Sequence, residues 1–282
     1  MLFTFQWDSV SSFEASRLNE AQNQLHYAVQ FIALAGKYLT ATAEDDSHTN
    51  MAWNHQLSQF EGRVIDDKIK IVVHLPSFSL RIVSEDDHLL CTLELNKKPF
   101  QEVFDWMKER LPDFDVDTSL LERTMHFELP DHPVGHVSPF QMPDDELLNQ
   151  LALHRSNSQR LLESVASPFE QASEIRTWPH HFDHGISIPL ELDSTGAVLR
   201  SFSVGYAIHD TLVDEPYVYV TQRKKDEVIS YDDAPELAFG QWLPEKLQGA
   251  VLPFSELTTV DYQQEKIVRF IDQTTEWWME TA

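Results

Sequence analysis

The chain has 282 residues, of which 42% are hydrophobic and 11% aromatic, so it can bury a substantial core and is too apolar to be disordered. Its 46 acidic residues against 21 basic ones give a formal net charge of -25. This charge repels phosphate backbones and anionic headgroups, so we expect neither nucleic acid nor a membrane as a partner.

The first half of the chain is expected to begin with a helix and continue with strands. Apolar residues recur at three-, four- and seven-residue steps over 18–39, which predicts one helix. Acidic turn-forming residues then separate three segments typical of antiparallel strands. These segments are 53–65, 68–83 and 89–95. Pro99 suits the first turn of a second helix, which Pro112 ends, and short strands are expected at 2–5 and 124–129.

The same order of elements then starts again. A helix is expected over 144–166, and a closing helix over about 259–280. Three strand-like segments lie between them. These segments are 175–192, 197–209 and 217–222. Because Trp53 and Trp178, each followed two positions later by a histidine, occupy equivalent places in the two runs, the sequence predicts an internal duplication.

We therefore expect an α+β fold of two related halves, each a helix, a three-stranded meander and a helix, with the helices packed on a mostly antiparallel sheet. The first half covers 1–130 and the second 144–282, joined by the proline-rich linker 131–143. The second half carries an insertion, 223–258, whose prolines and aromatic residues predict an ordered surface loop.

The segment 178–184 is the most typical of a functional site, because three histidines and one aspartate follow a Trp-Pro pair. If it is a strand, alternate side chains share a face. One face would then carry Trp178, His180, Phe182 and His184. The other face would carry His181 and Asp183, which could hold a divalent metal ion together, with His55 as a conceivable third ligand.

Three interpretations of this segment stay open. Asp183 could close a buried hydrogen-bond network. His181 and Asp183 could bind a divalent metal ion, or His180 or His181 could act in acid–base catalysis or ligand binding, since an imidazole pKa near 6.5 suits proton transfer. The candidate catalytic residues are His180, His181 and Asp183. The candidate ligand-binding residues are Trp53, His55, Trp178, Phe182 and His184.

Several of these residues also give the chain a resemblance to known proteins. The shared features are the pair Leu25-His26, Trp53 with His55, the stretch Trp178-Pro179-His180-His181-Phe182-Asp183 and the step Leu252-Pro253-Phe254. In these the chain resembles an uncharacterised bacterial family of unknown function with a Trp-Pro-x-His-Phe-Asp motif. The resemblance implies no activity, but it makes Trp178, His181, Phe182 and Asp183 the first residues to test.

Other features bear on location and function. Cys91 is the only cysteine, expected to be a buried inert thiol, and the N-terminus is unlike a secretory signal; both favour the cytoplasm. His74 and His209 are expected to be satisfied core histidines. We expect a small-molecule-binding protein with a pocket between the two halves, which could be a metal- or histidine-dependent enzyme. The alternative is a non-catalytic interaction protein that uses its acidic surface or the insertion.

Overall fold

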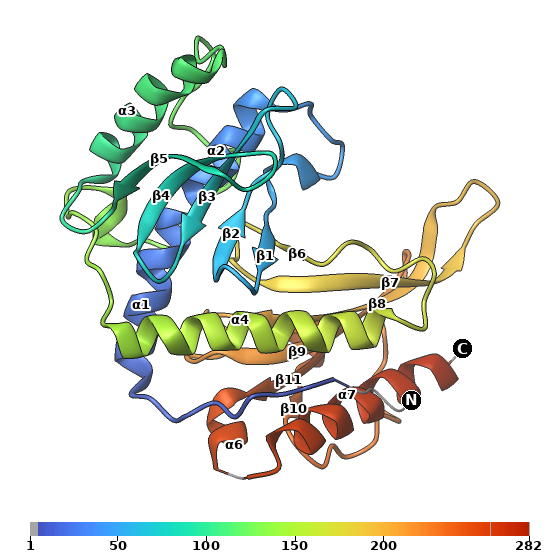
Figure 1. The fold of residues 1–282 in the computed structure, drawn as a ribbon. Coiled ribbons are helices and arrows are strands. Elements are labelled where there is room, and N and C mark those ends of the chain that lie inside the picture. The colour runs from blue at the N-terminus through green and yellow to red at the C-terminus, as the bar shows by residue number, and fades with distance from the viewer. Residues whose placement is uncertain (1–4, 260, 282) are drawn as a thin grey trace. The chain divides into compact units, whose positions relative to one another are not determined.

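The protein is described from a computed structural model, which defines residues 5–259 and 261–281 (Figure 1). The chain divides into two compact units. Unit 1 consists of Met1–Ala15, Leu153–Ile175 and Asp183–Ala282, and unit 2 of Ser16–Ala152 and Arg176–Phe182. Each unit is thus assembled from segments that are far apart in the sequence, and the predicted linker 131–143 lies inside unit 2. The expected internal duplication is not confirmed.

Both units combine α-helices with antiparallel strands, which confirms the predicted α+β class. The helices are α1 (Ala15–Ala28), α2 (Gln30–Leu39), α3 (Phe100–Arg110), α4 (Asp145–Ala166), α5 (Pro244–Leu247), α6 (Phe254–Thr258) and α7 (Gln263–Glu280). The strands of unit 2 are β1 (Ala52–Asn54), β2 (Gln59–Glu61), β3 (Ile69–His74), β4 (Ser79–Ser84), β5 (Leu89–Glu94) and β6 (Arg176–Thr177). The strands of unit 1 are β7 (His184–Leu192), β8 (Val198–Ala207), β9 (Tyr217–Lys224), β10 (Gln241–Trp242) and β11 (Gly249–Pro253). Among the described residues, no helix has the length and apolarity needed to cross a bilayer.

In unit 2, the strands β1 to β5 form an antiparallel sheet in chain order. The single strands predicted at 53–65 and 68–83 are wrong, because each is a hairpin of two short strands. Polar side chains bonded to the local backbone stabilise both turns. The Asn54 carboxamide oxygen accepts from the N–H groups of Gln56 and Leu57, and the His74 ring accepts from the Ser77 N–H. The first meander therefore has five strands instead of three.

The helices of unit 2 follow the predicted apolar periodicity with one interruption. The helix expected over 18–39 is divided at Val29 into α1 and α2, whereas α3 begins after Pro99 as predicted. Phe31 of α2 stacks on Phe100 of α3, with ring centroids 4.4 Å apart. The strand expected at 124–129 is wrong, since this segment contains no strand. Of the strand expected at 2–5, residues 2–4 lie outside the described residues.

In unit 1, the strands follow the order β10-β11-β9-β8-β7, and α4 and α7 confirm two predicted helices. The strand expected over 175–192 is interrupted by a turn at 179–181. The insertion 223–258 is more than a surface loop, because it supplies β11, which pairs with β9 along its whole length. Ala250, Val251 and Leu252 of β11 are fully buried, so this part of the insertion belongs to the core.

Candidate functional site

One face of the five-stranded sheet in unit 2 is lined by polar side chains. Along β3, Lys70 and His74 alternate with the buried residues Ile69, Ile71 and Val73, so the two sets lie on opposite faces. The ladder between β3 and β4 pairs Val72 with Arg81 and His74 with Ser79. Because directly paired residues share a face, Ser79 and Arg81 lie on the same face as Lys70 and His74.

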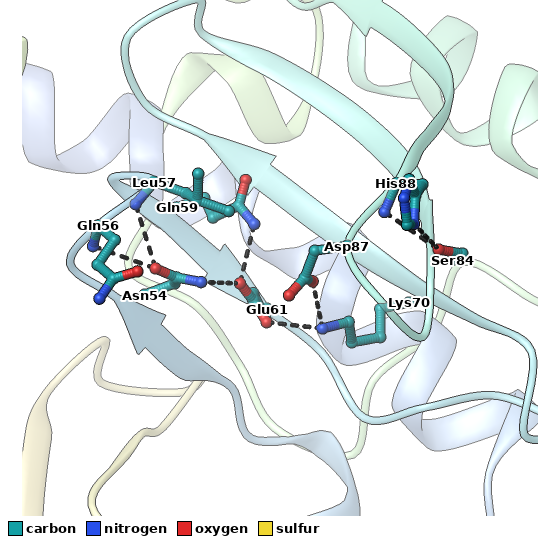
Figure 2. A network of polar contacts seen from close by, with 9 residues as sticks. All are labelled: Asn54, Gln56, Leu57, Gln59, Glu61, Lys70, Ser84, Asp87 and His88. Carbon is teal, nitrogen blue, oxygen red and sulfur yellow. Dashed lines mark hydrogen bonds and ion pairs between the residues drawn. The ribbon is translucent and has the colours of Figure 1, made fainter.

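Around Lys70 this face carries a closed set of polar contacts, the Lys70 network, made of Asn54, Gln59, Glu61, Lys70 and Asp87 (Figure 2). The Lys70 ammonium lies 2.9 Å from Glu61 and 2.5 Å from Asp87. The other oxygen of Glu61 accepts from Asn54 at 2.7 Å and from Gln59 at 2.8 Å. Burial raises the pKa of Glu61, but these hydrogen bonds outweigh it and the net shift is downward. All three charged groups, Lys70, Glu61 and Asp87, have partners, so this network has a structural role.

A second group on the same face is less saturated, and we name it the Arg81 cluster: His74, Ser77, Ser79 and Arg81. Its contacts converge on the Ser77 hydroxyl. Arg81 donates to this oxygen at 3.2 Å, His74 Nδ1 lies 2.8 Å from it, and the Ser79 hydroxyl lies 2.7 Å away. The guanidinium and the imidazole are therefore held against one shared atom.

Electrostatics fix the state of His74. Burial, followed by the charge of Arg81, lowers the pKa of His74 to about 4, so the ring is neutral at pH 7. The Ser77 N–H donates to Nδ1, which requires a lone pair there. The proton of the neutral ring is then on Nε2, which becomes a hydrogen-bond donor.

Arg81 carries the charge of the cluster without a counterion. Within residues 5–259 and 261–281 it forms no ion pair, and its Nε is buried without a hydrogen-bond partner. Burial lowers the pKa of Arg81, but a guanidinium stays protonated at neutral pH. The two serine hydroxyl protons are used within the cluster, from Ser77 to His74 Nδ1 and from Ser79 to Ser77. The cluster thus offers a cation and a neutral N–H donor, which suit a carboxylate or phosphate oxygen.

Among the sequence-predicted residues of unit 2, those from Trp178 to Phe182 surround a turn at 179–181, so the predicted strand alternation over 178–184 is wrong. The Phe182 N–H donates to the Trp178 carbonyl at 2.8 Å, and Phe182 has a left-handed φ of 54°. The shared metal site expected for His181 and Asp183 depended on strand geometry, in which alternate side chains lie on one face. The turn and the positive φ of Phe182 interrupt that geometry.

This turn is fixed by buried residues of α1 and α2. His26 Nε2 and the Gln30 amide both contact the Pro179 carbonyl, at 2.8 and 2.9 Å. The His26 ring also stacks on Phe182 at 5.3 Å, with an interplanar angle of 8°. Phe182, 1% exposed, further packs on Phe60, which contacts Trp53 at 4.9 Å. Trp53 and Phe182 are therefore members of one buried aromatic cluster.

The remaining predicted residues of unit 2 are more open. The rings of His180 and His181 lie 4.4 Å apart, with His180 half-buried and His181 exposed, and the half-buried Trp178 contacts His180. His55 is exposed in the turn between β1 and β2. In the part of the chain that the structure describes, no three His, Cys, Asp or Glu side chains are grouped so that they could hold a metal ion.

Asp183 and His184 belong to unit 1 and have partners there. The Tyr219 hydroxyl donates to Asp183 at 2.7 Å. The tyrosine ring packs against Gly205, where a Cβ atom would lie only 2.4 Å from the ring. Burial, followed by the charge of Asp183, raises the pKa of Tyr219 well above 10, so Tyr219 stays a donor. His184 is fully buried and contacts the Gln159 amide oxygen at 3.0 Å. These contacts are those of a hydrogen-bond network in a packed sheet.

The remaining predictions for single residues differ in outcome. His74 is bonded to Ser77 but only half-buried, so it is not a core histidine. His209 is half-buried and follows β8. The buried thiol expected at Cys91 is wrong, since Cys91 is half-buried on the edge strand β5. Arg81 was not among the residues predicted from the sequence. The signal that could have indicated it is the Leu75-Pro76-Ser77 turn, with His74 before it and Ser79 and Arg81 at alternate positions after it.

The chain matches no protein-family model, no curated protein and no solved structure. The resemblance to a family with a Trp-Pro-x-His-Phe-Asp motif stays a prediction.

Proposed function

We propose that the protein binds a small molecule that carries a carboxylate or phosphate group, and that the Arg81 cluster holds this group. The observation that carries the proposal is the half-buried Arg81 guanidinium, which has no acidic partner among the described residues and a buried Nε without a hydrogen bond. A guanidinium offers paired donors in a planar fork that matches an oxyanion. The neutral His74 ring, hydrogen-bonded to the same Ser77 oxygen as Arg81, adds an uncharged N–H donor.

This proposal keeps the small-molecule-binding function expected from the sequence but assigns it to other residues. Metal- or histidine-dependent catalysis by His180, His181 and Asp183 stays a prediction, as do the divalent metal and the pocket between the two halves. A cytoplasmic location belongs to the same proposal, and the free thiol of Cys91 supports it because such thiols suit a reducing compartment.

The test is a titration of the isotope-labelled protein with inorganic phosphate and, separately, with acetate, followed through the Arg81 Nε–H signal in NMR spectra. We expect a saturable shift with at least one of the two anions. Arg81→Gln should weaken binding about tenfold or more, because charge-assisted hydrogen bonds contribute about 1.5–3 kcal/mol. Arg81→Lys should bind with intermediate affinity, since it keeps the charge and loses the fork.

Arg110→Gln is the matched control, because Arg110 belongs to the same unit but pairs with Asp113 on the surface. It should leave anion binding unchanged. The proposal is refuted if Arg81→Gln binds both anions as the unmodified protein does. It is also refuted if the Arg81 signal does not respond at about 20 mM anion, which corresponds to a binding free energy weaker than about -2.3 kcal/mol.

A further inference from the structure

The polar face that carries the Arg81 cluster continues onto β5, the last strand of the five-stranded sheet. In the ladder between β4 and β5, Ser79 pairs with Glu94. The next pair on the same face joins Arg81 to Thr92. Directly paired residues share a face of the sheet, with Cβ atoms about 4.5–5.5 Å apart. Because His74 pairs with Ser79 from the other side, His74, Ser79 and Glu94 form one row across three strands.

The Arg81 side chain extends from its own position in the ladder toward this row. Its guanidinium donates to the Ser77 hydroxyl at 3.2 Å, and that hydroxyl lies 2.7 Å from the hydroxyl of Ser79. The guanidinium is therefore held near Ser79, which is the direct neighbour of Glu94. Among the described residues no ion pair joins Arg81 to Glu94, so two opposite charges lie on one face without direct contact.

Glu94 is open to solvent, as is Thr92. Two lysines follow β5, but neither is its partner. Lys98 pairs with Glu102 at 2.5 Å, and Lys97 forms no ion pair in the part of the chain that the structure describes. The carboxylate of Glu94 therefore remains available to a ligand that lies over the row.

The charge of the whole chain favours a ligand that carries both signs. A net charge of -25 repels a simple anion at long range. An ammonium group on the same ligand removes this repulsion, because the ligand then has no net charge. Glu94 offers that ammonium group a carboxylate at short range, where charge-assisted hydrogen bonds are strong.

We propose that the ligand of the Arg81 cluster is a zwitterion of the amino acid class. Its carboxylate binds Arg81 and the His74 N–H, and its ammonium group binds Glu94. This inference rests on the proposed function and adds Glu94 as the residue that determines specificity. Arg81 and Glu94 lie diagonally across β4 and β5, with Cα atoms about 7–8 Å apart. Side chains that start so close together can hold the two ends of one small molecule.

The test titrates the isotope-labelled protein at pH 7 with three amino acids and with the acids that lack their amino group. The pairs are glycine with acetate, β-alanine with propionate, and 4-aminobutyrate with butyrate. Binding is followed through the Arg81 Nε–H signal and the backbone amide signal of Glu94 in NMR spectra. We expect at least one amino acid to bind about three- to fivefold more tightly than its matched acid, the gain that an exposed ion pair provides.

Glu94→Gln should remove this preference, so that the amino acid and its matched acid bind with equal affinity. Glu109→Gln, on the exposed surface of α3, is the matched control. It makes the same change in net charge and should keep the preference. Because the preference compares two ligands on the same protein, a change in the stability of a variant does not alter it.

Two results would overturn this inference and leave the proposed function standing. One is equal affinity of the unmodified protein for every amino acid and its matched acid, with binding that still depends on Arg81. The other is tighter binding of both members of a pair by Glu94→Gln, since Glu94 would then be the counterion of Arg81. A lack of response to all six compounds at about 20 mM would refute the proposed function, and this inference with it.

Discussion

Replacing Lys70 by methionine tests whether the Lys70 network stabilises unit 2. The side chains of Lys70 and Glu61 are 11% and 13% exposed, and that of Asp87 is 36% exposed. Removing one partner of a fully buried ion pair costs about 3–5 kcal/mol, whereas an exposed pair contributes about 0–1 kcal/mol. Because one carboxylate is nearly buried and the other is open to water, we expect Lys70→Met to lower the free energy of unfolding by about 2–3 kcal/mol at pH 7.

The pH dependence of this loss follows from Glu61. Its folded pKa lies below 4.5, so its ionisation stabilises the fold above about pH 4.5, and this contribution is lost as the pH falls through the folded pKa. Without Lys70 the pKa of Glu61 rises, because only Asn54 and Gln59 still donate to it. The difference between variant and unmodified protein should therefore be largest at pH 7 and shrink at pH 4. The pKa of Lys70 itself is raised above 10.5, so Lys70 is charged at both values.

Amide hydrogen exchange of β3 and β4 is a suitable assay, because it reports the opening of this sheet even if the two units unfold separately. Lys68→Met is the control, since Lys68 is 46% exposed and lies 3.7 Å from Asp115; it should change stability by less than about 0.5 kcal/mol. Adding Glu61→Gln to Lys70→Met should recover part of the loss by removing the unpaired carboxylate. A stabilising role of the Lys70 network is refuted if Lys70→Met costs no more free energy of unfolding than Lys68→Met at pH 7, or if its cost at pH 4 equals its cost at pH 7.

Two further predictions concern unit 1. Gly205→Val should displace Tyr219 from Asp183, because its Cβ would lie 2.4 Å from the tyrosine ring, and should lower the free energy of unfolding in urea by about 2 kcal/mol or more. Gly196→Asn is the control, at an open turn position with positive φ, and should be nearly neutral. An unchanged Tyr219 environment in Gly205→Val would contradict this. His154→Phe should reduce the loss of stability at acidic pH. Burial, followed by the charge of Arg155, lowers the pKa of His154 to about 3, so as the pH falls the unfolded state binds a proton before the folded state does. In the unmodified protein the free energy of unfolding should therefore fall between about pH 6.5 and pH 3, by up to about 1.4 kcal/mol per pH unit. His181→Phe, at an exposed position, should leave that slope unchanged, and an equal slope in both variants would rule out the role of His154.

The sequence predicts the long elements of this fold well and the short turns poorly. The helices α3, α4 and α7 and the strands β5, β8 and β9 follow from apolar periodicity and flanking breakers, which act locally. The hairpin turns after Asn54 and His74 depend on side chains that bond to nearby backbone, and an apolar pattern continues through them unchanged. Apolar counting therefore merges two strands into one.

The same error hid the candidate site. In a single strand over 68–83, His74 and Arg81 would point to opposite faces, because they are an odd number of residues apart. The turn at 75–78 reverses the chain, and the pairing of His74 with Ser79 and of Val72 with Arg81 then puts both on one face. Trp53 and Phe182 could be singled out from the sequence, but their burial in an aromatic cluster depends on His26 and Phe60, whose contacts arise only from tertiary packing.

The contrast between two cations on one face is the strongest reason to assign a ligand to Arg81. Acidic residues outnumber basic ones 46 to 21, so a carboxylate is the commonest charged neighbour this chain can supply. Lys70 contacts two carboxylates. Arg81 lies two residues from Val83, the partner of Lys70 in the strand ladder, and among the described residues its guanidinium hydrogen-bonds only to the Ser77 hydroxyl. A net charge of -25 also excludes long-range attraction of an anion, so any anion held there must be held by short contacts. A planar guanidinium beside a neutral imidazole N–H provides contacts of that kind, which makes recognition depend on the shape of the bound group more than on its charge.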